Sequence, residues 1–157
     1  MSIHNTTVDI DGHIIKIETG LFGAQASGCV TVSCGDTVVL ATAVSSGPKE
    51  GLDYFPLTVE YREKHYAGGI ISSSRFVKRE GRPNDNEILT SRLIDRSIRP
   101  LFPSNYFDDV QVMVSPLSID GQNEPEILGI IASSAALAIS DLPWDGPVGA
   151  VRIGINQ

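Results

Sequence analysis

Residues 29–44 read CVTVSCGDTVVLATAV, two runs of apolar and β-branched residues on either side of a Gly-Asp pair. Such runs favour β-strands, and a Gly-Asp pair between them is typical of a tight hairpin turn. The second run is apolar at nearly every position, which is the pattern of a strand buried on both faces. We therefore expect a central hairpin here, with the rest of the sheet built around it.

Similar patterns extend outward from this hairpin. Before it, apolar and polar residues alternate around Asp11-Gly12, which predicts a second hairpin with a type I′ turn because Gly accepts a positive φ at no steric cost. After it, Gly47-Pro48 indicates a turn over residues 45–51. Three further runs predict strands, at residues 55–62, 110–119 and 149–155.

Two segments have the pattern of helices. Asn84 is followed three residues later by Glu87, which predicts a capping box at the start of a helix that Pro100 ends. Residues 125–140 predict a second helix, rich in Ala, Ile and Leu, in which Gly129 and Ala132–Ala136 form a small-residue face that suits close packing in the interior. The order of elements indicates one α+β domain over residues 1–157, with a mixed or antiparallel sheet covered by helices on one side.

Positive charge is concentrated in the middle of the chain. Residues 62–99 contain nine of the twelve Lys and Arg and five of the nineteen Asp and Glu, a net charge of +4 in a protein of net charge −7. The remainder therefore carries −11. An acidic protein repels polyanions as a whole, but a local group of cations can still hold a phosphate backbone.

Part of this charge lies in a stretch without periodicity, residues 66–83. There Phe76-Val77-Lys78-Arg79 places an aromatic ring beside two cations, and Arg82 precedes the first predicted helix. A base can stack on such a ring while Lys and Arg hold the flanking phosphates. An exposed loop with charges that serve solubility is the alternative.

The first predicted helix carries a row of arginines. Arg92, Arg96 and Arg99 follow one another at i, i+4 and i+7, so they project from one face, and Asp95 can pair with Arg99. Planar guanidinium groups in a row suit phosphate. The alternative is a solvated or interface face with ordinary ion pairs.

The sequence offers no catalytic constellation and no metal site. Its serines are not set in a nucleophile pattern with a histidine, and the glycine motifs of nucleotide enzymes are absent. Asp108-Asp109 indicates a surface turn at the entry to a strand. Cys29 and Cys34 match no zinc spacing and are expected to be free core thiols. No apolar run could span a membrane and no secretory signal is visible, so we expect a cytoplasmic protein.

Residues 78–103 read KREGRPNDNEILTSRLIDRSIRPLFP, and this block resembles the first RNase PH-like domain of the bacterial polynucleotide phosphorylase family. Blocks at residues 17–44, 53–69 and 145–154 extend the likeness over nearly the whole chain. The resemblance implies an RNase PH-like core of the ribosomal protein S5 domain 2-like fold. It also implies that the chain is truncated on the C-terminal side of this domain, without the second core and the KH and OB-type modules of the family.

The activity implied by the resemblance is that of a polyribonucleotide nucleotidyltransferase, a phosphorolytic 3′→5′ exoribonuclease of mRNA turnover. Inorganic phosphate is its co-substrate, and nucleoside diphosphates are released. The family forms a trimeric ring around a channel for single-stranded RNA, can join RNA-degradation complexes, and holds phosphate and Mg²⁺ mainly in the second core. The 157 residues alone are therefore expected to grip RNA without catalysing its cleavage.

The resemblance also assigns residues. Phe76, Val77, Lys78 and Arg79, with Arg82 after them, match the family loop that constricts the channel, although Val77 stands where a second Phe is usual. The three helix arginines match basic family positions that serve phosphate, channel or trimer contacts. Two alternatives remain open: a scaffold module whose basic face docks a protein, and a single-core RNase PH that trims tRNA 3′ ends.

Overall fold

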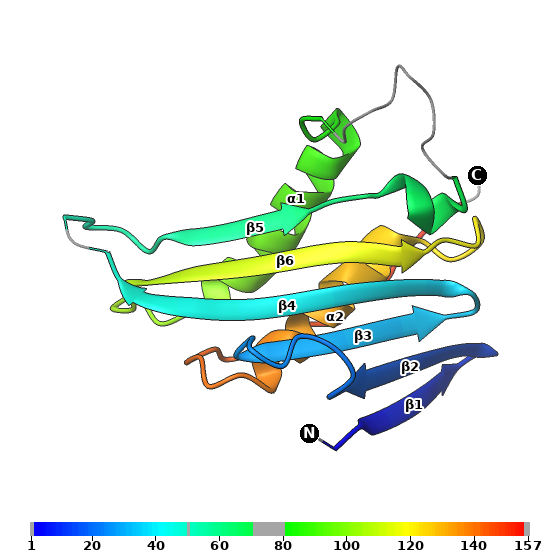
Figure 1. Cartoon of the computed structure of the whole chain (residues 1–157), viewed down its shortest axis with the longest axis horizontal. Coiled ribbons are helices and arrows are strands. Elements are labelled where there is room, and N and C mark those ends of the chain that lie inside the picture. Colours follow the sequence, from blue (N-terminus) through cyan, green and yellow to red (C-terminus); the bar gives the residue numbers. More distant parts are fainter. Residues whose placement is uncertain (1, 50, 71–80, 156–157) are drawn as a thin grey trace.

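The computed structural model describes residues 2–49, 51–70 and 81–155. These residues form one six-stranded sheet, two α-helices and two short 3₁₀ helices (Figure 1). The strands are β1 (His4–Ile10), β2 (His13–Thr19), β3 (Gly28–Cys34), β4 (Thr37–Pro48), β5 (Leu57–Tyr61) and β6 (Asp108–Ser118). The helices are η1 (His65–Gly68), α1 (Asp85–Ile98), η2 (Arg99–Leu101) and α2 (Pro125–Ala138). In the described ranges, none of these helices is long and apolar enough to cross a membrane.

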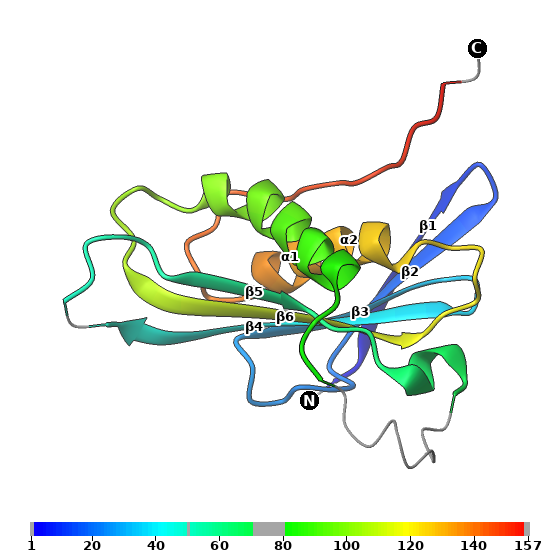
Figure 2. The same cartoon turned by 90° about the horizontal axis from the view of Figure 1, so that it is seen from above.

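The sheet is mixed, and both α-helices lie on the same face of it (Figure 2). Its strand order is β1-β2-β3-β4-β6-β5, and every neighbouring pair is antiparallel except β5 and β6, which run parallel. The predicted α+β class, with helices packed on one side of a mixed sheet, is confirmed. β5 is an edge strand, and α1 crosses beside it.

Both predicted hairpins are present. In the first, Ile10 pairs with His13, and the two residues between them have positive φ, 51° at Asp11 and 85° at Gly12. Positive φ at both positions is the signature of a type I′ turn. In the second, Cys34 pairs with Thr37, and Gly35 has a φ of 57°.

The predicted turn at residues 45–51 is wrong in its first part. β4 continues to Pro48, which pairs with Asp108, whereas Ser45 pairs with Val110. Three steps along β4 therefore match two along β6, which is the geometry of a β-bulge. The bulge accommodates Gly47-Pro48 within the strand, because a proline is tolerated where ladder bonding is interrupted.

The strand predicted at residues 149–155 is also wrong, since this segment makes no ladder with the described strands. Its alternating apolar side chains point into solvent, with Val151, Ile153 and Ile155 exposed by 75%, 81% and 89%. The alternation is a genuine strand pattern, but a strand also needs a neighbour to accept its backbone hydrogen bonds. The segment extends away from the sheet in Figure 2.

The core lies between the sheet and the helices. Its strand side is rich in valine, and Val39, Val112 and Val114 are essentially inaccessible to solvent. Its helix side includes Ile94 of α1 and the small residues of α2, as predicted. α2 comes so close to the start of β3 that a Cβ atom on Gly28 would lie 2.0 Å from the carbonyl oxygen of Ala136. Glycine is therefore required at that crossing.

Candidate nucleic-acid interface

The start of α1 is fixed by two acceptor side chains. Asn84 Oδ1 accepts a hydrogen bond from the Glu87 backbone N–H at 2.8 Å, and Glu87 Oε2 accepts one from the Asn84 N–H at 2.7 Å. This confirms the predicted capping box. The other carboxylate oxygen, Oε1, accepts from the Glu63 N–H at 2.8 Å. The buried Glu87 carboxylate therefore joins α1 to the chain that leaves β5.

A second contact closes the same region. Arg62 Nη2 donates to the Gly81 carbonyl at 2.9 Å, so the chain before residues 71–80 is tied to the chain after them. The predicted RNA-binding residues Phe76, Val77, Lys78 and Arg79 lie outside the described residues. Arg82 is described, and it is exposed just ahead of α1.

The tyrosine at the end of β5 completes this junction. Tyr61 is buried, its hydroxyl donates to Glu63 Oε1 at 2.9 Å, and its backbone N–H donates to Ser91 Oγ of α1 at 2.8 Å. Burial, with help from the Glu63 carboxylate, raises the pKa of the Tyr61 hydroxyl far above its ordinary value. The sequence did not identify Glu63 or Ser91, because only the fold brings them to Tyr61 and Glu87.

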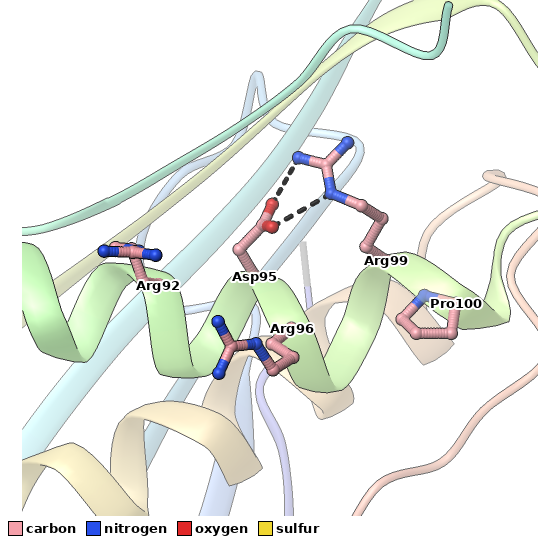
Figure 3. Close-up of a pocket in the computed structure, with 5 residues that line it drawn as sticks. All are labelled: Arg92, Asp95, Arg96, Arg99 and Pro100. Carbon is pink, nitrogen blue, oxygen red and sulfur yellow. Dashed lines mark hydrogen bonds and ion pairs between the residues drawn. The ribbon is translucent and has the colours of Figure 1, made fainter.

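The arginine row of α1 lines a hollow, as its spacing predicts. Arg92, Arg96 and Arg99 surround a space of about 310 Å³ together with Asp95 and Pro100. Figure 3 shows Arg92, Asp95 and Arg99 on the same side of the helix, with Arg96 lower across it. Arg92 and Arg96 are exposed, and Arg99 is half-buried.

Arg99 differs from the other two because its guanidinium is already occupied. Its Nε and Nη2 bind the two Asp95 carboxylate oxygens at 2.9 and 2.5 Å, which confirms the predicted pair. Nη2 also donates to the Leu57 carbonyl at 3.0 Å and Nη1 to that of Phe55 at 3.4 Å. The guanidinium carbon lies 5.9 Å from the centre of the Phe55 ring. Arg99 thus ties α1 to the start of β5.

Most other described cations are occupied as well. Lys16 and Lys49 pair with Glu18 and Asp109 at 2.8 and 2.5 Å, and Arg152 pairs with Glu124. Arg62 and Arg99 are held as above, and Lys64 also has an interaction. Of the nine Lys and Arg in the described ranges, three make no ion pair or hydrogen bond there: Arg82, Arg92 and Arg96. All three lie on α1 or directly before it.

Two further hollows adjoin the arginine hollow along β5. One, of about 430 Å³, shares Arg92 and is also lined by Val59, Glu60 and Ser91. The other, of about 480 Å³, shares Arg99 and is also lined by Tyr54. The sequence did not suggest Tyr54 or Val59 as site residues, since neither belongs to a motif.

Acidic and sulfur groups do not assemble into a site. Among the described residues, no three His, Cys, Asp or Glu side chains are grouped so that they could hold a metal ion. Asp108 and Asp109 are the first residues of β6 rather than a turn. Cys29 and Cys34 are free and buried, as predicted, and burial raises the pKa of both thiols.

Comparison with known proteins shows what the chain is similar to. Residues 11–143 match the sequence profile described as "3′ exoribonuclease family, domain 1". The polyribonucleotide nucleotidyltransferases of Geobacter sulfurreducens and Thermomicrobium roseum are each 55% identical to it, over 98% and 97% of the chain. The chain spans about a fifth of the length of these relatives, 22% and 19%.

Solved structures share the fold at lower identity. One is described as an Archaeoglobus fulgidus exosome with RNA bound to the active site, with a TM-score of 0.59 and 20% identity. It covers 93% of this chain and 57% of that one. Another is rice (Oryza sativa) Rrp46, with a TM-score of 0.57 and 17% identity, covering 91% of this chain and 56% of that one. These likenesses concern the fold alone.

Proposed function

The chain belongs to the 3′ exoribonuclease family as its domain 1, and from this premise we propose that it holds single-stranded RNA for a phosphorolytic 3′→5′ exoribonuclease. The name of its relatives supports RNA as the polymer, because polyribonucleotide nucleotidyltransferases act on RNA. Inorganic phosphate is the proposed co-substrate, and nucleoside diphosphates are the proposed products. The proposed role of this domain is grip rather than chemistry.

The observation that carries the proposal is the distribution of unpaired cations. In an acidic protein whose described Lys and Arg are mostly occupied, Arg82, Arg92 and Arg96 are left without partners in the described part of the chain. They follow one another along α1 and its entry, and two of them line a hollow. Phosphates of a single strand are the ligand that such a row would hold.

The finer parts of the proposal come from the family resemblance. Phe76, Val77, Lys78 and Arg79 would contact RNA together with Arg82. Residues 1–157 would be part of the first core of a longer cytoplasmic protein, a homotrimer that can join RNA-degradation partners. The family resemblance implies that Mg²⁺ would be held in the second core. Among the described residues of this chain, no three His, Cys, Asp or Glu side chains are grouped so that they could hold it.

RNA binding across a salt series tests the proposal. For single strands, the slope of log affinity against log salt changes by about 0.7 for each phosphate contact. The double variant Arg92→Gln/Arg96→Gln should therefore lower the slope by about 1.4, measured by fluorescence anisotropy with a labelled oligoadenylate. Lys78→Ala/Arg79→Ala should lower it in the same way. The isolated chain should release no nucleoside diphosphate from RNA and phosphate.

Lys16→Gln/Arg152→Gln is the matched control, because it removes the same charge from residues that are paired elsewhere. It should leave the slope unchanged. If Lys16→Gln/Arg152→Gln lowers the slope as much as Arg92→Gln/Arg96→Gln does, only the net charge of the protein matters. The proposed RNA role of α1 would then be wrong. Phosphate-dependent cleavage by the isolated chain would contradict the assignment of grip without chemistry.

One observation favours a second candidate, a docking surface for a protein. Leu89 and Leu93 lie exposed on α1, next to Arg92 and Arg96. Exposed apolar residues among cations suit an acidic, partly apolar protein surface. This candidate predicts that Leu89→Ser/Leu93→Ser abolishes partner binding without changing RNA affinity, which separates it from the RNA proposal.

A further inference from the structure

We propose that the RNA path on this domain continues along the outer edge of β5 to Tyr54, where the exposed phenol ring stacks on a base. The inference rests on the proposed function, because the same strand must pass Arg92 and Arg96. It adds a base-binding platform that lies on the far side of Arg99 from Arg82.

Continuity of the surface is the first support. The hollow beside Val59 shares Arg92 with the arginine hollow, and the hollow beside Tyr54 shares Arg99 with it. The three spaces therefore adjoin one another along β5. From Tyr54 to Glu60 an extended chain covers roughly 20 Å at about 3.3 Å per residue, enough to accommodate several nucleotides.

The open edge of β5 is the second support. The Val110 backbone N–H donates to the Pro56 carbonyl, and the Arg62 backbone N–H donates to the Val114 carbonyl. The backbone N–H and C=O groups of the even-numbered residues in this segment therefore face β6. In a parallel ladder the odd-numbered residues then face outward. Arg99 occupies the Leu57 carbonyl and Ser91 the Tyr61 N–H, which leaves the Val59 peptide groups facing the open edge. They offer one donor and one acceptor to a base or a ribose hydroxyl.

Tyr54 itself is the third support. Its side chain is 60% exposed, although it lies beside the packed ring of Phe55 and lines a hollow of about 480 Å³. A flat ring on a concave surface, next to cations, is how sequence-tolerant binding of single strands is built. Asp109 in the same hollow is neutralised by Lys49 at 2.5 Å, so it does not set up an unpaired negative charge against the phosphates.

The inference is tested by measuring RNA affinity with oligonucleotides of different length and with variants that keep or remove the aromatic ring of Tyr54. With a long oligoadenylate, Tyr54→Ala should weaken binding about 5- to 30-fold. This fold-change corresponds to the lower part of the range of stacking free energies for one base on an aromatic ring. Tyr54→Phe should stay within about twofold of the parent, because it keeps the ring. With a dinucleotide, which cannot reach from Arg92 to Tyr54, none of these variants should change affinity. Phe22→Ala, an exposed aromatic on the β2–β3 connection, is the control.

The outcomes distinguish the proposed path to Tyr54 from the proposed RNA-binding function on which it rests. If Arg92→Gln/Arg96→Gln weakens binding and Tyr54→Ala does not, the RNA grip stands and the path to Tyr54 is wrong. If neither weakens binding, both are wrong. An equal loss in Tyr54→Ala and Phe22→Ala would also overturn the inference, because the effect would then not depend on the β5 edge.

Discussion

Replacing Glu87 should destabilise the junction between α1 and the end of β5, which supports the candidate interface. Glu87 is 6% exposed, and its carboxylate accepts two backbone hydrogen bonds, from Asn84 at 2.7 Å and from Glu63 at 2.8 Å. Hydrogen bonds to a charged acceptor contribute about 1.5–3 kcal/mol each. Asn84 and Glu63 are exposed, so water can replace part of each bond, and we take the lower half of that range. Two such bonds mean that Glu87→Ala should lower the free energy of unfolding by about 3–4.5 kcal/mol. That corresponds to a fall in Tm of about 6–18 °C for a chain of this size.

Two variants calibrate this expectation. Glu87→Gln keeps the shape but turns one acceptor into an amide N–H₂ that faces a donor, so it should cost about 1–3 kcal/mol. Asp85→Ala, in the same turn, removes an exposed carboxylate whose stabilisation of the helix dipole is about 0.3–1 kcal/mol. Urea unfolding followed by circular dichroism gives the three free energies. Native-state hydrogen exchange should show lost protection at the Glu63 amide. A Glu87→Ala variant no less stable than Asp85→Ala would refute the reasoning.

The remaining predictions concern acid stability and thiol chemistry. Hydrogen bonds from the Asn123 backbone and side chain and from Gln122 hold the pKa of Asp120 well below its ordinary value, so its contribution to stability is present above that value and is lost as the pH falls through the folded pKa. The difference in unfolding free energy between the parent and Asp120→Asn should therefore be largest near neutral pH and shrink below about pH 4, and urea titrations that show a constant difference down to the lowest pH would contradict this. Burial raises the pKa of the Cys29 and Cys34 thiols, so iodoacetamide should modify them much more slowly in the native chain than in urea, whereas equal rates by mass spectrometry would count against their burial.

The sequence predicted the elements that depend on local chemistry. The turn at Asp11-Gly12 and the start of α1 at Asn84 are each specified by residues within one turn of the chain, and both are confirmed. The family resemblance is confirmed by the match over residues 11–143. The strand at residues 149–155 was wrong because a strand depends on a partner, and an alternating pattern carries no information about whether one is present.

The site shows the same division between local and long-range information. Spacing along α1 placed Arg92, Arg96 and Arg99 in one hollow, but it could not distinguish them. Arg99 is occupied by carbonyls from Phe55 and Leu57, more than forty residues earlier in the chain. The roles predicted for residues 76–79 fall outside the described residues and stay predictions.

This division changes how the positive charge of the middle segment should be understood. Counting Lys and Arg treats every cation as available to RNA. However, the Arg62 side chain donates to the Gly81 carbonyl, and the Arg99 side chain donates to the carbonyls of Phe55 and Leu57. They hold α1 against β5, which fixes the helix that presents Arg92 and Arg96. A lysine at either position would keep the charge but lose the planar fork that reaches several acceptors at once. The positive charge of residues 62–99 therefore predicts a binding site for a polyanion, while the contacts of Arg62 and Arg99 indicate that Arg92 and Arg96 are the cations of α1 left to bind it.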